Sequence, residues 1–168
     1  MKPVTEEKLL LELAELRHPI TLEQPQAVLR VQCFGNFDVF TAHGELVHFE
    51  RAKAKELFAY LVSKRGGSCN IRSLAGILFE DTPYDIKQST YMRTILSSLT
   101  KSLRAVGAEA VLKKNYNEVA IDTQLLDCDY YRFLRGEVSA VNRYQGEFMA
   151  QYSWAEFVTG YIEQKTGK

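Results

Sequence analysis

One stretch in the middle of the chain combines cations, hydroxyls and a tyrosine at helical spacing. Its members are Lys87, Tyr91, Thr94, Ser98 and Lys101, which fall alternately four and three residues apart, on one side of a helix. Small side chains let a helix approach DNA closely, and hydroxyls and cations contact phosphates and base edges. The pattern therefore predicts a recognition helix for the major groove of double-stranded DNA. A solvated amphipathic helix is the alternative that periodicity leaves open.

Further basic and hydroxyl side chains flank this face or follow it in the sequence. These additional candidates are Arg93, Ser97, Arg104, Lys113 and Lys114. Between positions 87 and 114 there are six basic residues and one acidic residue, although the whole chain has 21 of each. A basic segment between mildly acidic ones is the charge distribution that a DNA-binding surface requires.

No catalytic or metal-binding constellation is predicted. The histidines have no His-x-x-x-His spacing, and no cysteine stands beside them at metal-ligand spacing. Cys33, Cys69 and Cys128 are far apart and odd in number, which predicts reduced thiols in or near the core. Asp127 and Asp129 flank Cys128 and are explained by a helix N-cap and a solvated neighbour. We therefore expect a protein that is not an enzyme and that has neither metal nor cofactor.

The composition is that of an ordinary globular protein. Of the 168 residues, 46% are hydrophobic and 25% are charged, which argues against disorder. No run of about eighteen apolar residues exists, so no membrane span is expected. The first residues lack the apolar core of a signal peptide, which predicts a cytoplasmic protein.

The N-terminal third predicts one helix, a linker and a small sheet. Leucines at helical spacing predict a helix over 5–17, and the two prolines in 18–28 indicate a linker. Branched and alternating residues over 28–34 and 37–40, a turn at Ala42 to Glu45 and a return over 46–49 predict an antiparallel meander.

Three helices and a hairpin are expected to position the candidate side chains. The elements are helices over 52–64, after Asn70 and over 85–106, and strands over 110–114 and 118–122. Asn70 and Asp85 are suitable N-caps, and Asp85 with Gln88 forms a capping-box pattern. The remainder is predicted to be helical, with a second capping box at Ser153 and Glu156. We expect the aromatics Trp154 and Phe157 in the core.

Five segments in order resemble the antibiotic-regulatory-protein (SARP) family of transcriptional activators. Phe34-Gly35-Asn36-Phe37-Asp38-Val39 resembles its opening strand, and residues 51–61 and 73–79 resemble its first two helices. Residues 92–103 resemble its recognition helix. Tyr144 to Met149, followed by Trp154-Ala155-Glu156, resembles the start of its helical activator domain.

The resemblance implies an α+β fold, a winged helix-turn-helix with an N-terminal antiparallel sheet and a short C-terminal helical extension. The expected boundaries are a winged-helix domain at 29–123 and the extension at 124–168. The implied function is a sequence-specific DNA-binding transcription regulator. The expected partner is double-stranded DNA, and RNA polymerase and a second copy of the chain on DNA are further candidates. No association with a membrane is expected.

The beginning of the chain is similar to the end of a response-regulator receiver domain. Lys2-Pro3-Val4-Thr5 and the leucine-rich helix over 5–17 resemble that domain's final loop and helix, so residues 1–17 would be a remnant of a receiver domain. The chain would then be the output part of a two-component response regulator, with Lys2 left from the receiver's phosphoryl pocket. A native N-terminus with a chance Lys-Pro pair is the alternative.

Two departures from the family pattern support a different function. Family recognition helices usually carry more arginine where this chain has Ser98 and Thr100, which implies fewer phosphate contacts. Only about forty residues follow the hairpin, too few for a full stack of helical repeats. A winged helix that contacts another protein and binds no DNA is therefore the second hypothesis.

Overall fold

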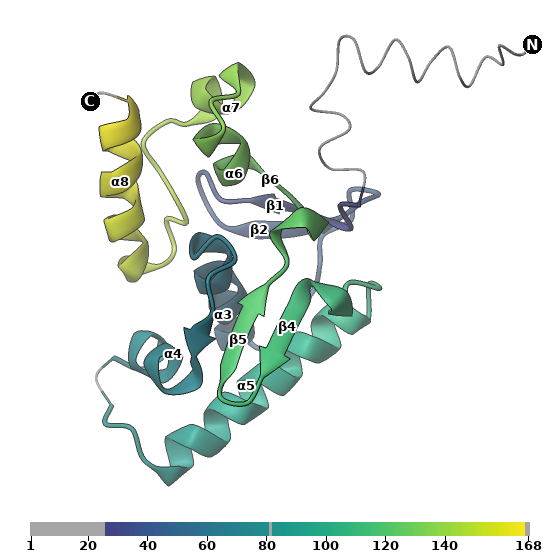
Figure 1. The fold of residues 1–168 in the computed structure, drawn as a ribbon, viewed down its shortest axis with the longest axis vertical. Coiled ribbons are helices and arrows are strands. Elements are labelled where there is room, and N and C mark those ends of the chain that lie inside the picture. Colours follow the sequence, from purple (N-terminus) through teal and green to yellow (C-terminus); the bar gives the residue numbers. More distant parts are fainter. Residues whose placement is uncertain (1–25, 81, 167–168) are drawn as a thin grey trace, which may run out of the picture.

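The computed structural model describes residues 26–80 and 82–166, which form two small sheets surrounded by helices (Figure 1). This mixture of strands and helices confirms the predicted α+β class. The helix predicted at 5–17 and most of the linker predicted at 18–28 lie outside the described residues. In the described part of the chain, no helix is both long and apolar enough to cross a membrane.

The first sheet contains three strands in the order β2-β1-β6. Strand β1 (Leu29–Gln32) pairs antiparallel with β2 (Asp38–Thr41) and parallel with β6 (Leu126–Cys128). Alternate residues of β1 are buried and exposed, as expected for a strand with one face on a core. The sheet thereby joins the beginning of the described chain to the start of the C-terminal helices.

The predicted antiparallel meander is correct for β1 and β2 but wrong in its third strand. Leu46 makes only an isolated bridge with Phe40, and the third strand is instead the parallel β6. This strand has three residues, too few for a periodic signal, and its partner lies far upstream in the sequence.

Three helices follow the first two strands, as predicted. They are α3 (Ala52–Ser63), α4 (Ile71–Leu78) and α5 (Ile86–Arg104). The Asn70 side chain accepts hydrogen bonds from the backbone N–H groups of Arg72 and Ser73, so it caps α4. Asp85 caps α5 by accepting from the N–H of Gln88 at 2.8 Å. The reciprocal half of the capping box is not formed, because the Gln88 amide donates to the carbonyl oxygen of Thr82.

The second sheet contains the predicted hairpin and one additional short strand. Its order is β3-β5-β4, with β3 (Cys69–Asn70), β4 (Leu112–Asn115) and β5 (Glu118–Ile121). The short helical turns η1 (Glu109–Val111) and η2 (Thr123–Leu125) flank the hairpin. All its pairs are antiparallel, and Asn117 turns the hairpin with a φ of +65°. Because β3 leads directly into α4, this sheet brings the start of α4 beside the hairpin tip, where the Ile71 N–H donates to the Asn117 carbonyl.

The C-terminal part is helical, as predicted, but two details are wrong. It contains α6 (Asp129–Leu134), α7 (Val138–Arg143), the turn η3 (Ser153–Ala155) and α8 (Glu156–Thr166). Ser153 begins η3, behind an N-cap position at Tyr152 that makes no side-chain bond, so it does not form the predicted capping box. Phe157, expected in the core, has 86% of its surface exposed. In Figure 1, α6 and α7 lie at the opposite end of the molecule from α5.

One continuous core joins these helices to the rest of the chain. The Tyr131 hydroxyl donates to the Val62 carbonyl at the end of α3, and the Trp154 indole N–H donates to Glu56 at 2.9 Å. The Met149 N–H donates to the Cys33 carbonyl. Burial raises the pKa of Tyr131 far above its ordinary value, which keeps this hydroxyl protonated as a donor.

Candidate nucleic-acid interface

The exposed face of α5 carries most of the predicted site residues, but it is rotated relative to the prediction. The exposed members of the predicted set are Lys87, Tyr91, Arg93, Thr94, Ser97, Lys101 and Arg104. Ser98 is wrongly placed by the prediction, because it is buried and faces the core. Within the described residues its hydroxyl has no hydrogen-bond partner. The exposed face is therefore centred near Ser97 and Lys101.

The neighbouring serines explain this error. Ser97 and Ser98 are both small and polar, so side-chain type alone does not distinguish the inner from the outer position. Ser98 shares the buried side with Ile95, Leu99 and Ser102, whereas Ser97 shares the exposed side with Lys101. The buried side of α5 is wider than its apolar residues indicate, because it also includes polar residues. The predicted exposed face therefore included a buried position.

A groove between α5 and the hairpin brings four predicted cations together. This α5–hairpin groove has a volume of about 260 Å³ and is lined by Arg93, Leu96, Ser97, Thr100, Lys101, Arg104 and Lys114. The Lys114 ammonium donates to the Thr100 hydroxyl at 3.2 Å, which directs this lysine toward α5. Lys101 and Arg104 line it from the helix. The arrangement offers several N–H donors for an anionic backbone.

Two of the predicted cations already have acidic partners in the chain. Arg104 donates two hydrogen bonds to the carboxylate of Glu109, at 2.8 and 2.9 Å. The hydrogen bonds between the two raise the pKa of Arg104 and lower that of Glu109. Lys113 lies 4.0 Å from a carboxylate oxygen of Asp122. Consecutive residues of a strand point to opposite faces, so Lys113 and Lys114 cannot both line the α5–hairpin groove.

Three residues that the sequence reasoning missed line a second hollow beside this groove. Arg72, Tyr84 and Tyr116 contribute to a cavity of about 450 Å³ between α4, α5 and the hairpin. The Arg72 guanidinium lies over the Tyr84 ring, 5.0 Å from its centroid, and 90% of the Tyr116 surface is exposed at the hairpin tip. The Asn70 cap is the signal that places Arg72 at the start of α4, but pairing of β3 with the hairpin was needed to bring it here.

The predicted candidate Tyr91 packs against α4 with part of its ring and leaves the rest exposed. Its ring centroid lies 5.2 Å from that of Phe79 at the end of α4, and 42% of its surface is exposed. Lys87 lies in the first turn of α5, two residues after the Asp85 cap, and is exposed.

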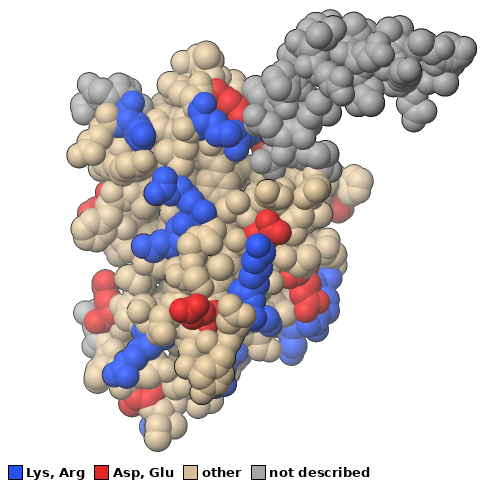
Figure 2. Space-filling view, in the orientation of Figure 1, with Lys and Arg blue, Asp and Glu red and all other residues tan. Residues whose placement is uncertain are grey.

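The surface around α5 and the hairpin is not uniformly positive. Figure 2 shows basic and acidic side chains interleaved on the face where the hairpin lies.

The described residues contain one group with the side chains of a metal site. Cys33, Cys128 and Asp129 place their sulfur and oxygen atoms within 4.8 Å of one another. The Asp129 carboxylate is already bonded to three backbone N–H groups, from Cys33, Phe34 and Tyr130. Burial raises the pKa of both Asp129 and Cys33, which disfavours the charged forms that bind metals.

Comparison with solved structures shows a protein with a similar fold. One matching structure is Mycobacterium tuberculosis EmbR, solved in complex with a low affinity phosphopeptide, with a TM-score of 0.67 and 16% sequence identity. The match covers 82% of the present chain and 42% of the EmbR chain, so this chain spans less than half of that protein's length. No protein-family description and no curated protein sequence matches the chain.

Proposed function

We propose that this chain is the DNA-binding part of a transcription regulator and that its α3–α5 and hairpin unit is a winged helix. In this proposal α5 enters the major groove, and the hairpin contacts the adjacent backbone or the minor groove. The observation that carries it is the convergence of Lys101, Arg104 and Lys114 around the α5–hairpin groove. The SARP-like fold, shared with a regulator, supports it.

Roles for individual residues follow from where they lie. Lys101, Arg104 and Lys114 are proposed to bind phosphates, together with Arg72 at the start of α4. Arg93, Thr94 and Ser97 are exposed on α5 and are proposed to face base edges. A role as the output part of a response regulator rests on the resemblance around Lys2 alone, because that segment lies outside the described residues.

Selection of genomic fragments followed by titration at several salt concentrations tests the proposal. A chain with about four phosphate contacts should lose affinity with a slope of about −4 in log affinity against log salt. Binding of a selected sequence in preference to a scrambled duplex should persist across the series. Absence of any selected fragment, together with a slope near zero, would contradict the proposal.

A protein–protein module is the second candidate function, and a specific observation favours it. Glu109 and Asp122 lie beside two of the cations, and Figure 2 shows acidic side chains among the basic ones. Such a mixed surface is typical of contacts with another protein. Under this alternative Lys101→Ala would weaken capture of a protein partner while the chain bound no DNA fragment at any salt concentration.

A further inference from the structure

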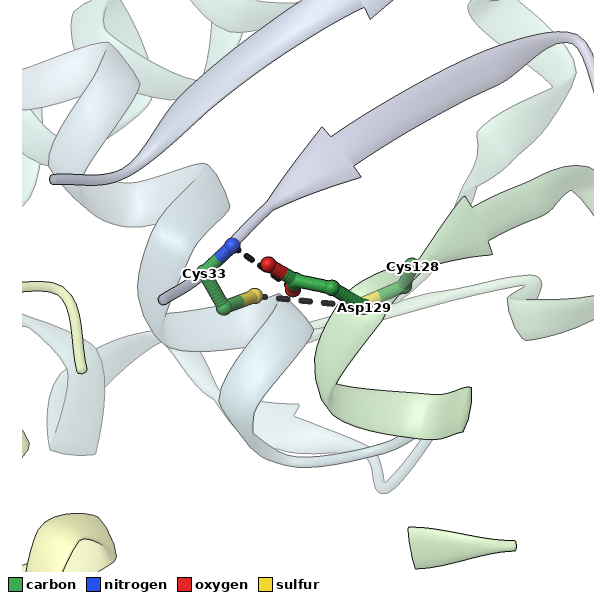
Figure 3. A group of neighbouring side chains, drawn as sticks. All are labelled: Cys33, Cys128 and Asp129. Carbon is green, nitrogen blue, oxygen red and sulfur yellow. Dashed lines mark hydrogen bonds between the residues drawn. The ribbon is translucent and has the colours of Figure 1, made fainter. Parts of the chain in front are cut away.

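Two cysteines from distant parts of the sequence meet beside the first sheet (Figure 3). Cys33 follows β1, and Cys128 is the last residue of β6, the strand parallel to β1. Their Sγ atoms are 3.6 Å apart, and neither residue exposes more than 1% of its surface. A disulfide bond is about 2.05 Å long, so the sulfurs would need to approach by only about 1.5 Å.

Asp129 holds the backbone on both sides of this pair. One carboxylate oxygen accepts from the N–H groups of Cys33 and Tyr130, at 2.8 and 2.7 Å, and the other accepts from Phe34 at 3.1 Å. Figure 3 shows this carboxylate directed at the Cys33 backbone. Because Asp129 follows Cys128 directly, the same hydrogen bonds keep the two thiols adjacent.

A metal ion does not explain the pair. A structural zinc site needs four ligands, whereas the group contains two sulfurs and one carboxylate that is already hydrogen-bonded. Of the described residues, no histidine joins the group, since His43 and His48 are exposed. Two thiols in contact, without further ligands, are instead the starting geometry for a disulfide.

We propose that Cys33 and Cys128 form a latent disulfide, which a small peroxide closes when the C-terminal helices open locally. One thiol, as its thiolate, attacks hydrogen peroxide; the O–O bond breaks, and a sulfenic acid and one water result. The second thiolate attacks the sulfenic sulfur, the S–O bond breaks, and a second water leaves. The two thiols thus lose two electrons and two protons, and one peroxide is reduced to two waters.

The fold makes this reaction slow and dependent on opening. Both sulfurs are enclosed, and burial raises the pKa of Cys33, so little nucleophilic thiolate is present in the closed protein. The segment around Phe148 and Met149 runs beside Cys33, because its backbone bonds to Phe34 and Cys33. Local separation of this segment and α6 would admit peroxide.

The bond would close a loop that contains the whole of α3, α4, α5 and the hairpin. Crosslinks across long loops stabilise mainly by restricting the unfolded chain, and more so for longer loops. The oxidised protein should therefore melt several degrees above the reduced protein. The crosslink also fixes β1 to the start of α6, at the opposite end of the molecule from α5 (Figure 1).

The experiment treats the purified protein with hydrogen peroxide and follows the thiols by mass spectrometry without reduction. A Cys69→Ser variant removes the third thiol and leaves the pair, and Cys33→Ala and Cys128→Ala in that background are the matched controls. We expect an internal Cys33–Cys128 crosslink, a melting temperature raised by several degrees and reversal by dithiothreitol. Subdenaturing urea should accelerate crosslinking, and the alanine controls should form no internal bond.

The wild-type peptide map decides the result even if an alanine variant fails to fold. Crosslinks through Cys69, disulfide-linked dimers, or thiols that remain free after urea-induced opening would each overturn the proposal. An oxidised protein that melts no higher than the reduced one would do the same. Zinc added to the reduced protein should leave the rate of crosslinking unchanged; stoichiometric zinc binding that protects both thiols would show a metal site instead.

Discussion

At the scale of single residues, Lys101 occupies the centre of the exposed face of α5 and also lines the α5–hairpin groove. Replacing Lys101 with alanine should weaken binding to all duplexes alike and reduce the salt slope by about one, because a phosphate contact carries no sequence information. Ser97→Ala is the matched control on the same face and should alter sequence preference instead. Anisotropy titrations on a selected and a scrambled duplex separate the two effects. A Lys101→Ala protein with unchanged affinity for both duplexes would exclude this phosphate contact.

Ser98 provides the complementary test of which face of α5 is free. Its buried hydroxyl has no partner among the described residues, and such a group costs stability. Ser98→Ala should therefore leave the free energy of unfolding unchanged or raise it by up to about 1 kcal/mol. Denaturant unfolding measures this, and the sequence preference should match the parent protein. If Ser98→Ala changed the preferred duplex, Ser98 would face DNA, as the sequence predicted, and the orientation of α5 in the structure would be wrong.

Glu109 is expected to reduce DNA affinity through its bonds to Arg104. Glu109→Gln should weaken the bonds that hold Arg104 and remove a negative charge beside the α5–hairpin groove. Both side chains are exposed, so the substitution should not disturb the fold. Affinity should rise severalfold at low salt and converge with the parent at high salt, because salt screens exposed charges. Glu45→Gln, in the exposed turn after β2 and outside both hollows, is the comparison. Equal effects of the two substitutions would show that only net charge matters.

At the scale of elements, the hairpin separates two adjacent lysines that the sequence cannot distinguish. Lys114 donates to Thr100 on α5, whereas Lys113 approaches Asp122. Lys114→Ala should therefore cost more DNA affinity at low salt than Lys113→Ala. Both should leave the melting temperature within a few degrees, since exposed substitutions usually change stability by under about 0.5 kcal/mol. Titration of the two single variants on one duplex at two salt concentrations decides it, and a larger loss for Lys113→Ala would reverse the proposed geometry.

Local signals predicted the elements with caps and strong periodicity, and failed where distant segments pair. Asn70 and Asp85 correctly mark the starts of α4 and α5, because their side chains satisfy free backbone N–H groups in the first turn. The strands β3 and β6 have two and three residues, and each forms only because a partner far away in sequence lies beside it. For the same reason Arg72 was not predicted near the hairpin.

The candidate site was predicted in its residue types more accurately than in its geometry. Ser98 is the one predicted side chain on α5 that the structure buries, because periodicity did not show how far around the helix the core extends. The pairing of Arg104 with Glu109 depends on η1 returning the chain toward the end of α5, and composition does not predict such a return.

At the scale of the whole molecule, the C-terminal helices share their core with the proposed DNA-binding unit. Trp154 connects them, because its indole N–H donates to Glu56 on α3 and its ring packs against Tyr60 at 5.1 Å between centroids. It also stacks on Tyr152, at 5.4 Å. Helix α3 in turn packs against α5. Disturbance of the extension should therefore reach the helix proposed to read DNA.

Trp154→Ala should destabilise the whole chain, whereas Phe157→Ala, three residues later, should not. Loss of the Trp154 ring and its hydrogen bond is expected to cost about 3 kcal/mol, the magnitude for a large aromatic in a packed environment. Phe157 is 86% exposed, so its removal should change stability by under about 0.5 kcal/mol. Because the core is continuous, both variants should unfold in one transition, measured by circular dichroism and by limited proteolysis. If Trp154→Ala melted in two steps, with the α3–α5 unit retaining the parent's midpoint, the extension would be an independent body and its coupling to α5 would be lost.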